Sequence, residues 1–330
     1  KKGDPTRPGP VVEPGQQSYV AALDRPLSQL VPGAKTTQRR LQFARWVTDP
    51  ANPLTARVWV NRVWQYHFGS GLVRSPDNFG FTGDRPTHPE LLDWLARELI
   101  ANNWSTKHLH RSMLLSQTYR QSSLHPKQDE YAAVDAGNHL WWRGERRRRD
   151  AESLRDALLQ AAGQLDASRM GGPGFSPSLT AEATEGLSMK GNAWKASPPT
   201  EQRRRAVYTF SKRGLLPPLA TAFDLPDTTL PCGRRDVTTV APQALALLNN
   251  PFVHEQSAAL AKRVNEVATS DQERVRSAWR LALGREPRAS ELAAALAHLA
   301  EQQRRLASPN LALASLCHVL LNANEFVYVD

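Results

Sequence analysis

Prolines and glycines divide the last third of the chain into segments of helical length. Pro251, Gly284, Pro287 and Pro309 stand between stretches whose apolar residues recur every three or four positions. Since proline cannot continue a helix and glycine commonly ends one, each stretch is expected to form a separate helix. The pattern predicts helices over residues 243–248, 252–267, 272–283, 290–306 and 311–325. Such short helices are stabilised mainly by packing their apolar faces together.

The first half of the chain carries the same helical period. It predicts helices over residues 37–47, 53–68 and 150–163, and two more through residues 91–99 and 109–114. Thr87-His88-Pro89-Glu90 matches a capping box with Thr87 as the N-cap, and Ser105 is the expected cap of the following helix. The glycine-rich stretch between Gly69 and Pro86 predicts a long ordered loop.

The fold class predicted is mainly α, a helical domain with long ordered loops and a small β element near residues 205–212. Side chains alternate there in the manner of a strand. We expect residues 1–36 to be a Pro/Gly-rich strap or linker and 37–165 an N-terminal helical half. Residues 166–240 are expected to be a loop-rich segment with the short strand, and 241–330 a C-terminal helical half. Together 37–330 are expected to form one compact unit.

The charge of the chain is strongly basic and is carried mostly by arginine. The formal net charge is +10, and 33 of the 42 basic residues are arginine. Guanidinium binds carboxylate, sulfate or phosphate through paired hydrogen bonds. Selection for anion binding and a genome rich in arginine codons both explain this excess. No nucleic-acid fingerprint, phosphate loop or nucleophile elbow occurs, so we expect no nucleic-acid partner. No run of eighteen apolar residues occurs, which predicts no membrane span.

The two cysteines, Cys232 and Cys317, are far apart and form no C-x-x-C pair. We therefore expect no metal site and no haem attachment in this chain, so that any haem belongs to another domain or partner. Cys317 falls on an apolar helical period and is predicted to face the core, whereas Cys232 lies in a turn. Two separate environments are favoured over a disulfide.

One predicted helix combines hydrogen-bonding side chains with an apolar face. Arg57, Asn61 and Gln65 are spaced at i, i+4 and i+8 and so share one side of residues 53–68, and Arg62 is a further candidate. This polar face either lines a binding groove or is the solvated side of an amphipathic helix.

Two other segments carry candidate ligand-binding residues. His88 stands at a helix start, where backbone N–H groups collect, and either helps to bind an anion or hydrogen-bonds the preceding loop. Arg234, Arg235 and Asp236 lie in a glycine-led loop before a helix that we expect a threonine to cap. They either grip an anionic sugar or form a salt bridge that pins the loop to a helix. His88 and Asp236 are the candidates for acid or base catalysis.

Several long strings resemble the planctomycete domain of unknown function 1553, and the resemblance covers nearly the whole chain. The strings include Thr48-Asp49-Pro50-Ala51-Asn52-Pro53-Leu54-Thr55-Ala56-Arg57, Pro86-Thr87-His88-Pro89-Glu90-Leu91-Leu92-Asp93, Thr118-Tyr119-Arg120-Gln121-Ser122-Ser123, Leu154-Arg155-Asp156-Ala157-Leu158, Cys232-Gly233-Arg234-Arg235-Asp236 and Ala241-Pro242-Gln243-Ala244-Leu245.

The resemblance implies the C-terminal part of a large exported protein, with a cytochrome-like haem domain upstream, in bacteria rich in polysaccharide degradation. It implies a periplasmic or extracellular location, with the signal peptide outside this chain, and it supplies no catalytic residues. Two functions are open. One is binding, with or without processing, of an anionic polysaccharide as part of polysaccharide utilisation. The alternative is a non-catalytic scaffold that docks a haem domain or a neighbouring subunit. We expect Arg62, His88, Arg234 and Asp236 to converge if the first is correct.

Overall fold

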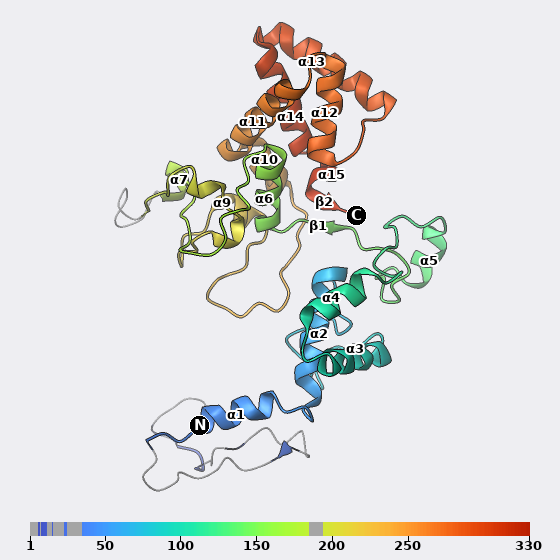
Figure 1. Ribbon diagram of the computed structural model, residues 1–330, viewed down its shortest axis with the longest axis vertical. Coiled ribbons are helices and arrows are strands. Elements are labelled where there is room, and N and C mark those ends of the chain that lie inside the picture. The colour runs from blue at the N-terminus through green and yellow to red at the C-terminus, as the bar shows by residue number, and fades with distance from the viewer. Residues whose placement is uncertain (1–5, 7, 12–14, 16–22, 25–34, 185–193) are drawn as a thin grey trace. The chain divides into compact units, whose positions relative to one another are not determined.

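The structure, a computed structural model, divides the chain into two compact units. It describes residues 6, 8–11, 15, 23–24, 35–184 and 194–330 (Figure 1). One unit spans residues 1–145 and the other residues 146–330. The sequence, in contrast, predicts a single unit over 37–330. The helix that ends the expected N-terminal half packs with the C-terminal helices, so the division falls before it. Most of the expected strap over 1–36 lies outside the described residues.

The first unit is built around three helices that pack on one another. The described elements are α1 (Arg39–Val47), α2 (Pro53–Phe68), α3 (Pro89–Ala101), α4 (Thr106–Leu114) and α5 (Gln128–Val134). α2, α3 and α4 contact each other and bury Val60, Leu99 and Leu109 between them. Ser105 caps α4 as predicted, by accepting a hydrogen bond from the His108 backbone N–H.

The start of α3 differs from the predicted capping box. The N-cap is His88, with Pro89 at the first helical position, and no side chain caps the helix. Thr87 is engaged elsewhere, because its backbone N–H donates to the Leu72 carbonyl at 2.9 Å and its hydroxyl to the same oxygen at 3.4 Å. These bonds hold the long loop, which buries Leu72 completely. The ordered loop predicted between Gly69 and Pro86 is thus confirmed, whereas the predicted capping box with Thr87 as N-cap is wrong.

The second unit is mainly helical, and its described elements match most of the predicted helices. They are β1 (Arg147–Arg148), α6 (Ala151–Ala161), α7 (Ala181–Thr184), η2 (Glu201–Arg203), η3 (Ala206–Tyr208), α9 (Pro218–Ala222), α10 (Ala241–Asn249), α11 (Pro251–Val267), α12 (Asp271–Leu283), α13 (Ala289–Leu306), α14 (Pro309–Leu321), α15 (Asn324–Val327) and β2 (Tyr328–Val329). The mainly α fold class is therefore confirmed.

The strand predicted over Arg205 to Lys212 is wrong in its extent. This segment contains a short 3-10 helix, η3, and only isolated bridges, among them Phe175 with Thr209. Its neighbour over residues 171–174 cannot extend that bridge into a ladder, since Gly171 and Gly172 have positive φ and Pro173 lacks an N–H. The two-stranded sheet of the second unit instead pairs β1 with β2, antiparallel.

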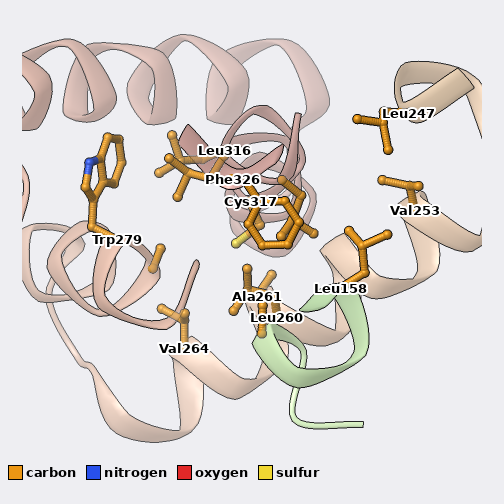
Figure 2. Packing of buried hydrophobic residues seen from close by; sticks show 14 of the residues in the cluster. Leu158, Leu247, Val253, Leu260, Ala261, Val264, Trp279, Leu316, Cys317 and Phe326 are labelled. Atoms are coloured by element: carbon orange, nitrogen blue, oxygen red, sulfur yellow. The ribbon is translucent and has the colours of Figure 1, made fainter. Parts of the chain in front are cut away.

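One hydrophobic core holds α6 and α9–α15 together (Figure 2). α14 is central to it and packs against α11 and α13. Cys317 of α14 lies among these side chains with no exposed surface, and burial raises the pKa of its thiol to about 12. Cys232 is exposed, and both cysteines are free thiols. The expectation of two separate environments is confirmed.

Arg155 of α6 fastens the loop-rich segment onto that helix, and the buried Arg204 links two parts of the segment. Arg155 donates to the carbonyls of Gln202 and Arg204, the latter at 3.1 Å. Arg204 in turn donates to the carbonyls of Gly171 and Pro173, the latter at 2.9 Å. These bonds satisfy backbone carbonyls that no helix or sheet uses.

The surroundings of Arg155 explain why it can be buried. Its guanidinium lies 4.9 Å from the centre of the Phe175 ring and 5.4 Å from that of Phe252. Burial lowers the pKa of Arg155 to about 10, so the group remains a cation at neutral pH. The neighbouring Asp156 accepts a 2.6 Å hydrogen bond from the Ala206 backbone N–H, and desolvation raises the pKa of this carboxyl.

A three-residue ion network joins the ends of α12, α13 and α15. Arg285 donates to Glu291 through two 2.8 Å bonds and to Glu325 through bonds of 2.5 and 2.7 Å. The Arg285 guanidinium and then the Arg288 backbone N–H lower the pKa of Glu291 to about 2. The pKa of a glutamate in the unfolded chain is about 4.3. The carboxylate therefore stabilises the fold fully above that pH, and the contribution is lost as the pH falls through about 2.

We predict that Glu291→Gln lowers the free energy of unfolding by about 1 kcal/mol at pH 7, and that the difference from the unmodified protein vanishes as the pH approaches about 2. Urea denaturation across this pH range measures it. Glu255→Gln, which removes an exposed carboxylate of α11, is the control and should show no such pH dependence. A deficit for Glu291→Gln that is the same at every pH would contradict the assignment.

Candidate functional site

The polar face predicted on α2 is used for contacts inside the first unit. Arg57 donates to Asp93 of α3 at 2.6 Å and to the Pro53 carbonyl at 2.8 Å. The Arg57 guanidinium hydrogen bond lowers the pKa of Asp93 despite partial desolvation. Gln65 is buried, with 8% of its surface exposed. Arg57 is thus a link between two helices.

Asn61 of the same face is a tie between α2 and the loop that follows it. Its amide nitrogen donates to the Val73 carbonyl at 3.0 Å, and its amide oxygen accepts from the Val73 N–H at 2.8 Å. Only 1% of Asn61 is exposed. A Cβ on Gly71 would lie 2.6 Å from the Asn61 amide nitrogen, which explains a glycine there. This residue therefore lies in the interior, on neither a groove wall nor a solvated surface.

His88 is half-buried at the start of α3. Its Nδ1 lies 3.0 Å from the Thr87 hydroxyl, and that hydroxyl in turn reaches the Leu72 carbonyl of the preceding loop. Of the two interpretations of His88, hydrogen bonding toward the loop is the one with a partner among the described residues.

Arg62, in contrast, lines a cavity of about 310 Å³ between the end of α1 and the start of α2. The other residues around this cavity are mostly apolar: Trp46, Val47, Asn52, Leu54, Thr55, Val58 and Trp59. Trp59 is 44% exposed, so part of its ring faces solvent. Arg62 is exposed and has no carboxylate within salt-bridge distance among the described residues. Among the described residues of this lining Arg62 is the one charged side chain, and it contributes a positive charge to the cavity.

Hydrogen bonds across the turn between α1 and α2 fix the shape of this cavity. The Thr55 hydroxyl donates to the Val47 carbonyl at 2.6 Å, and the Asn52 amide donates to the Trp46 carbonyl at 3.2 Å. The Asn52 side chain also caps α2 by accepting from the Leu54 N–H at 3.0 Å. The indole of Trp59 and the guanidinium of Arg62 are therefore presented by a helix whose first turn is anchored.

In the second unit, the loop Pro231 to Val240 is fastened to the start of α6. The Arg235 guanidinium donates to the Glu152 carboxylate through two bonds of 2.5 and 2.9 Å. It also lies 3.8 Å from the carboxylate of Asp150, the N-cap of α6. Of the two interpretations of the loop arginines, Arg235 fits the one in which a salt bridge pins the loop to a helix.

A buried ion pair holds the other end of that loop. Arg148 of β1 donates to Asp224 at 2.8 Å and to the Thr238 carbonyl at 2.7 Å, and only 2% of its side chain is exposed. Asp224 also accepts from the Thr238 N–H at 2.8 Å and from its hydroxyl at 2.9 Å. Desolvation raises the pKa of Asp224, but the bonds from Thr238 and Arg148 outweigh it and the net shift is downward.

The helix after the loop begins without the threonine cap that we expected. Val240 is the N-cap of α10, and its N–H lies 3.4 Å from the side-chain oxygen of Gln243. The nearby Thr238 is held instead by Asp224 and by the Gln243 amide, which donates to the Thr238 hydroxyl at 3.0 Å. The loop thus presents Arg234 and Asp236, both exposed, from a backbone fixed on both sides.

The predicted site residues are therefore distributed over two units, each with its own surroundings. Arg57, Asn61, Arg62, Gln65 and His88 belong to the first unit, and Arg234, Arg235 and Asp236 to the second. The expected convergence of Arg62 and His88 with Arg234 and Asp236 joins both units and stays a prediction. Trp59 was not among the site residues predicted from the sequence. It stands three residues before Arg62 on the same side of the helix, but the predicted site on this helix included polar side chains only.

Within the described part of the chain, no group of three or more histidine, cysteine or acidic side chains is arranged to hold a metal ion. In those same residues, no helix combines the length and the apolar character that crossing a bilayer requires.

These features define a mainly helical protein with two compact units, an apolar cavity bearing one arginine in the first and an anchored arginine loop in the second. The chain belongs to the PSD1 family, proteins of unknown function (DUF1553), whose family model matches residues 39–299. The resemblance inferred from the sequence strings is thus confirmed. No curated protein and no solved structure matches the chain.

We predict that Asp224→Ala destabilises the protein by about 3–5 kcal/mol, because it leaves the buried Arg148 cation without its carboxylate. The control Asp227→Ala removes an exposed carboxylate three residues later, which accepts a local hydrogen bond from the Thr229 backbone N–H, and it should have a much smaller effect on stability. Chemical denaturation of both variants measures the difference. Equal, small effects would show that the Arg148 and Asp224 pair does not anchor the loop.

Proposed function

We propose that the protein binds an anionic polysaccharide, and that the cavity between α1 and α2 holds one sugar unit of it. The observation that carries this proposal is that a partly exposed tryptophan, Trp59, and an exposed arginine with no carboxylate partner among the described residues, Arg62, line one cavity. An indole face packs on the C–H face of a sugar ring, and a guanidinium binds a sulfate or carboxylate through two hydrogen bonds.

The size and charge of the cavity support a charged sugar over other ligands. A volume of about 310 Å³ is at the small end of ligand sites and has room for the one sugar unit proposed. The positive charge of Arg62 disfavours cations, and the described residues of the lining include no aspartate or glutamate to oppose an anion. The exposed arginines elsewhere would add a general attraction for a polyanion.

This proposal also gives the cellular setting. Anionic polysaccharides occur mainly outside the cytoplasm. We therefore propose a periplasmic or extracellular location, in keeping with polysaccharide utilisation by an exported protein. The proposal requires no cofactor in this chain. It assigns binding, and any processing of the glycan would need groups beyond Trp59 and Arg62.

The alternative function, a scaffold that docks a haem domain or a neighbouring subunit, has one observation in its favour. The anchored loop of the second unit exposes Arg234 beside a fixed Arg235. A rigid cationic loop is suited to an acidic protein surface, such as the haem edge of a cytochrome. The two functions use different residues, so variants distinguish them.

We predict that Trp59→Ala and Arg62→Ala each weaken binding of dextran sulfate at least about tenfold, which corresponds to about 1.4 kcal/mol. Calorimetric titration measures the affinity, with uncharged dextran as the reference ligand. Trp94→Ala is matched to Trp59→Ala, since Trp94 of α3 is 45% exposed. Arg111→Ala removes an exposed arginine of α4 and is matched to Arg62→Ala.

Neither control should change the affinity for dextran sulfate by more than about twofold. If all four variants weaken binding equally, the attraction is a property of the net charge and the cavity is not the site. If only Arg234→Ala weakens binding, the anchored loop is the binding surface and the proposal for the cavity fails.

A further inference from the structure

A second cavity, of about 210 Å³, lies at the surface of the second unit where the ends of four helices meet. It is formed by the end of α11, the start of α12, the later part of α13 and the start of α14, which lie together in Figure 1. Its lining is Asn265, Asp271, Arg274, Leu299, Gln303, Pro309, Asn310 and Leu313. None of these residues belongs to the candidate sites described above.

The cavity is polar but carries no net charge. Among the described residues of its lining two side chains are charged, Asp271 and Arg274, and they bind each other at 2.8 Å. The remaining polar groups are the amides of Asn265, Gln303 and Asn310, of which the Asn265 nitrogen donates to the Asn310 oxygen at 3.1 Å. Each amide offers both a donor and an acceptor. A ligand that reaches the cavity therefore meets both hydrogen-bond donors and acceptors.

The floor of the cavity is apolar and rigid. Leu299 and Leu313 are each 2% exposed and belong to the hydrophobic core that joins α11 to α14. Ser270 and Ser308 cap the two helices that start at the rim, by accepting from the Glu273 and Leu311 N–H groups. The polar side chains thus stand on helices whose positions are fixed by packing.

We propose that this cavity binds one neutral sugar residue, either free or at the end of a chain. A sugar presents hydroxyl groups that each donate and accept, which match amide side chains, and a C–H face that matches the two leucines. An anion would lie against Asp271 and a cation against Arg274. An apolar ligand would bury the amides without hydrogen bonds, which is unfavourable.

The size of the cavity limits the ligand to a single residue. At about 30 Å³ for each water molecule, its volume corresponds to about seven waters, which suits one pyranose ring. This inference is independent of the Trp59 and Arg62 cavity, because it concerns another unit, other residues and an uncharged ligand.

Saturation-transfer NMR tests the proposal, with D-glucose, D-galactose, D-mannose, L-fucose and D-xylose each at about 5 mM, a concentration suited to millimolar affinity. We expect transfer to at least one of these sugars, unchanged by added NaCl. Gln303→Ala and Asn310→Ala should each weaken the affinity for that sugar at least about tenfold, and the transfer should fall accordingly. Gln302→Ala, on the same helix outside the lining, is the matched control. Methyl glycosides of the bound sugar distinguish a site for a free sugar from a site for a chain end. Only a site that accepts a chain end leaves room for the methyl group on the anomeric oxygen.

Asn310 also bonds Asn265, so Asn310→Ala can alter stability, and Gln303→Ala then decides the result. No transfer to any sugar in the folded protein would overturn the proposal, as would transfer that Gln303→Ala leaves unchanged. Dextran sulfate binding should persist in Gln303→Ala, and sugar transfer should persist in Trp59→Ala. A failure at one cavity is thereby separated from a failure at the other.

Discussion

The arrangement of the second unit depends on guanidinium groups that donate to backbone carbonyls. Residues 166–184 and 194–212 contain little regular structure, so their carbonyls have few partners in helices or sheets. Buried carbonyls without hydrogen bonds destabilise a fold. Arg155 and Arg204 meet four of these carbonyls, and the aromatic rings of Phe175 and Tyr208 cover their guanidinium faces. The loop-rich segment can therefore lie on a helical core without forming a sheet of its own.

This role accounts for part of the arginine content. Arg57, Arg148, Arg235 and Arg285 also form links within one unit, each to a carboxylate. Arg62 and Arg234 are different, because they are exposed on elements whose backbone is already anchored. Arginine is thus used here in two ways, as an internal link and as an exposed cation. Only the second use is available for a ligand, and it selects Arg62 and Arg234 from the larger set predicted from the sequence.

Helices could be predicted where local signals agreed with one another. Over residues 241–330, breakers such as Gly284 and Pro309 and a strong apolar period determine the helices locally, and the structure contains four of the five close to the predicted bounds. The fifth, predicted over 311–325, ends at Leu321 and is followed by the separate short helix α15. The segment 205–212 failed because alternation alone does not supply a partner strand. The nearby residues 171–174 are glycine and proline, and they allow single bridges only.

The candidate sites were harder to predict because side-chain partners come from distant parts of the sequence. Asn61 meets the Val73 backbone and Arg235 meets Glu152, and no local pattern indicates either contact. Thr87 likewise lost its expected capping role to the Leu72 carbonyl. The Trp59 and Arg62 cavity depends on a turn that brings Val47 against Thr55, which a helical period cannot show.

Hydrogen exchange of Arg204→Met tests most directly whether guanidinium to carbonyl bonds hold the loop-rich segment. The amides of Phe175, Ser197 and Phe210, which bond backbone carbonyls within this segment, report on it. Our account predicts exchange at least about tenfold faster at these amides, with protection unchanged in α11 to α14. Unchanged exchange at the three amides, or an equal loss of protection across the helices, would contradict it.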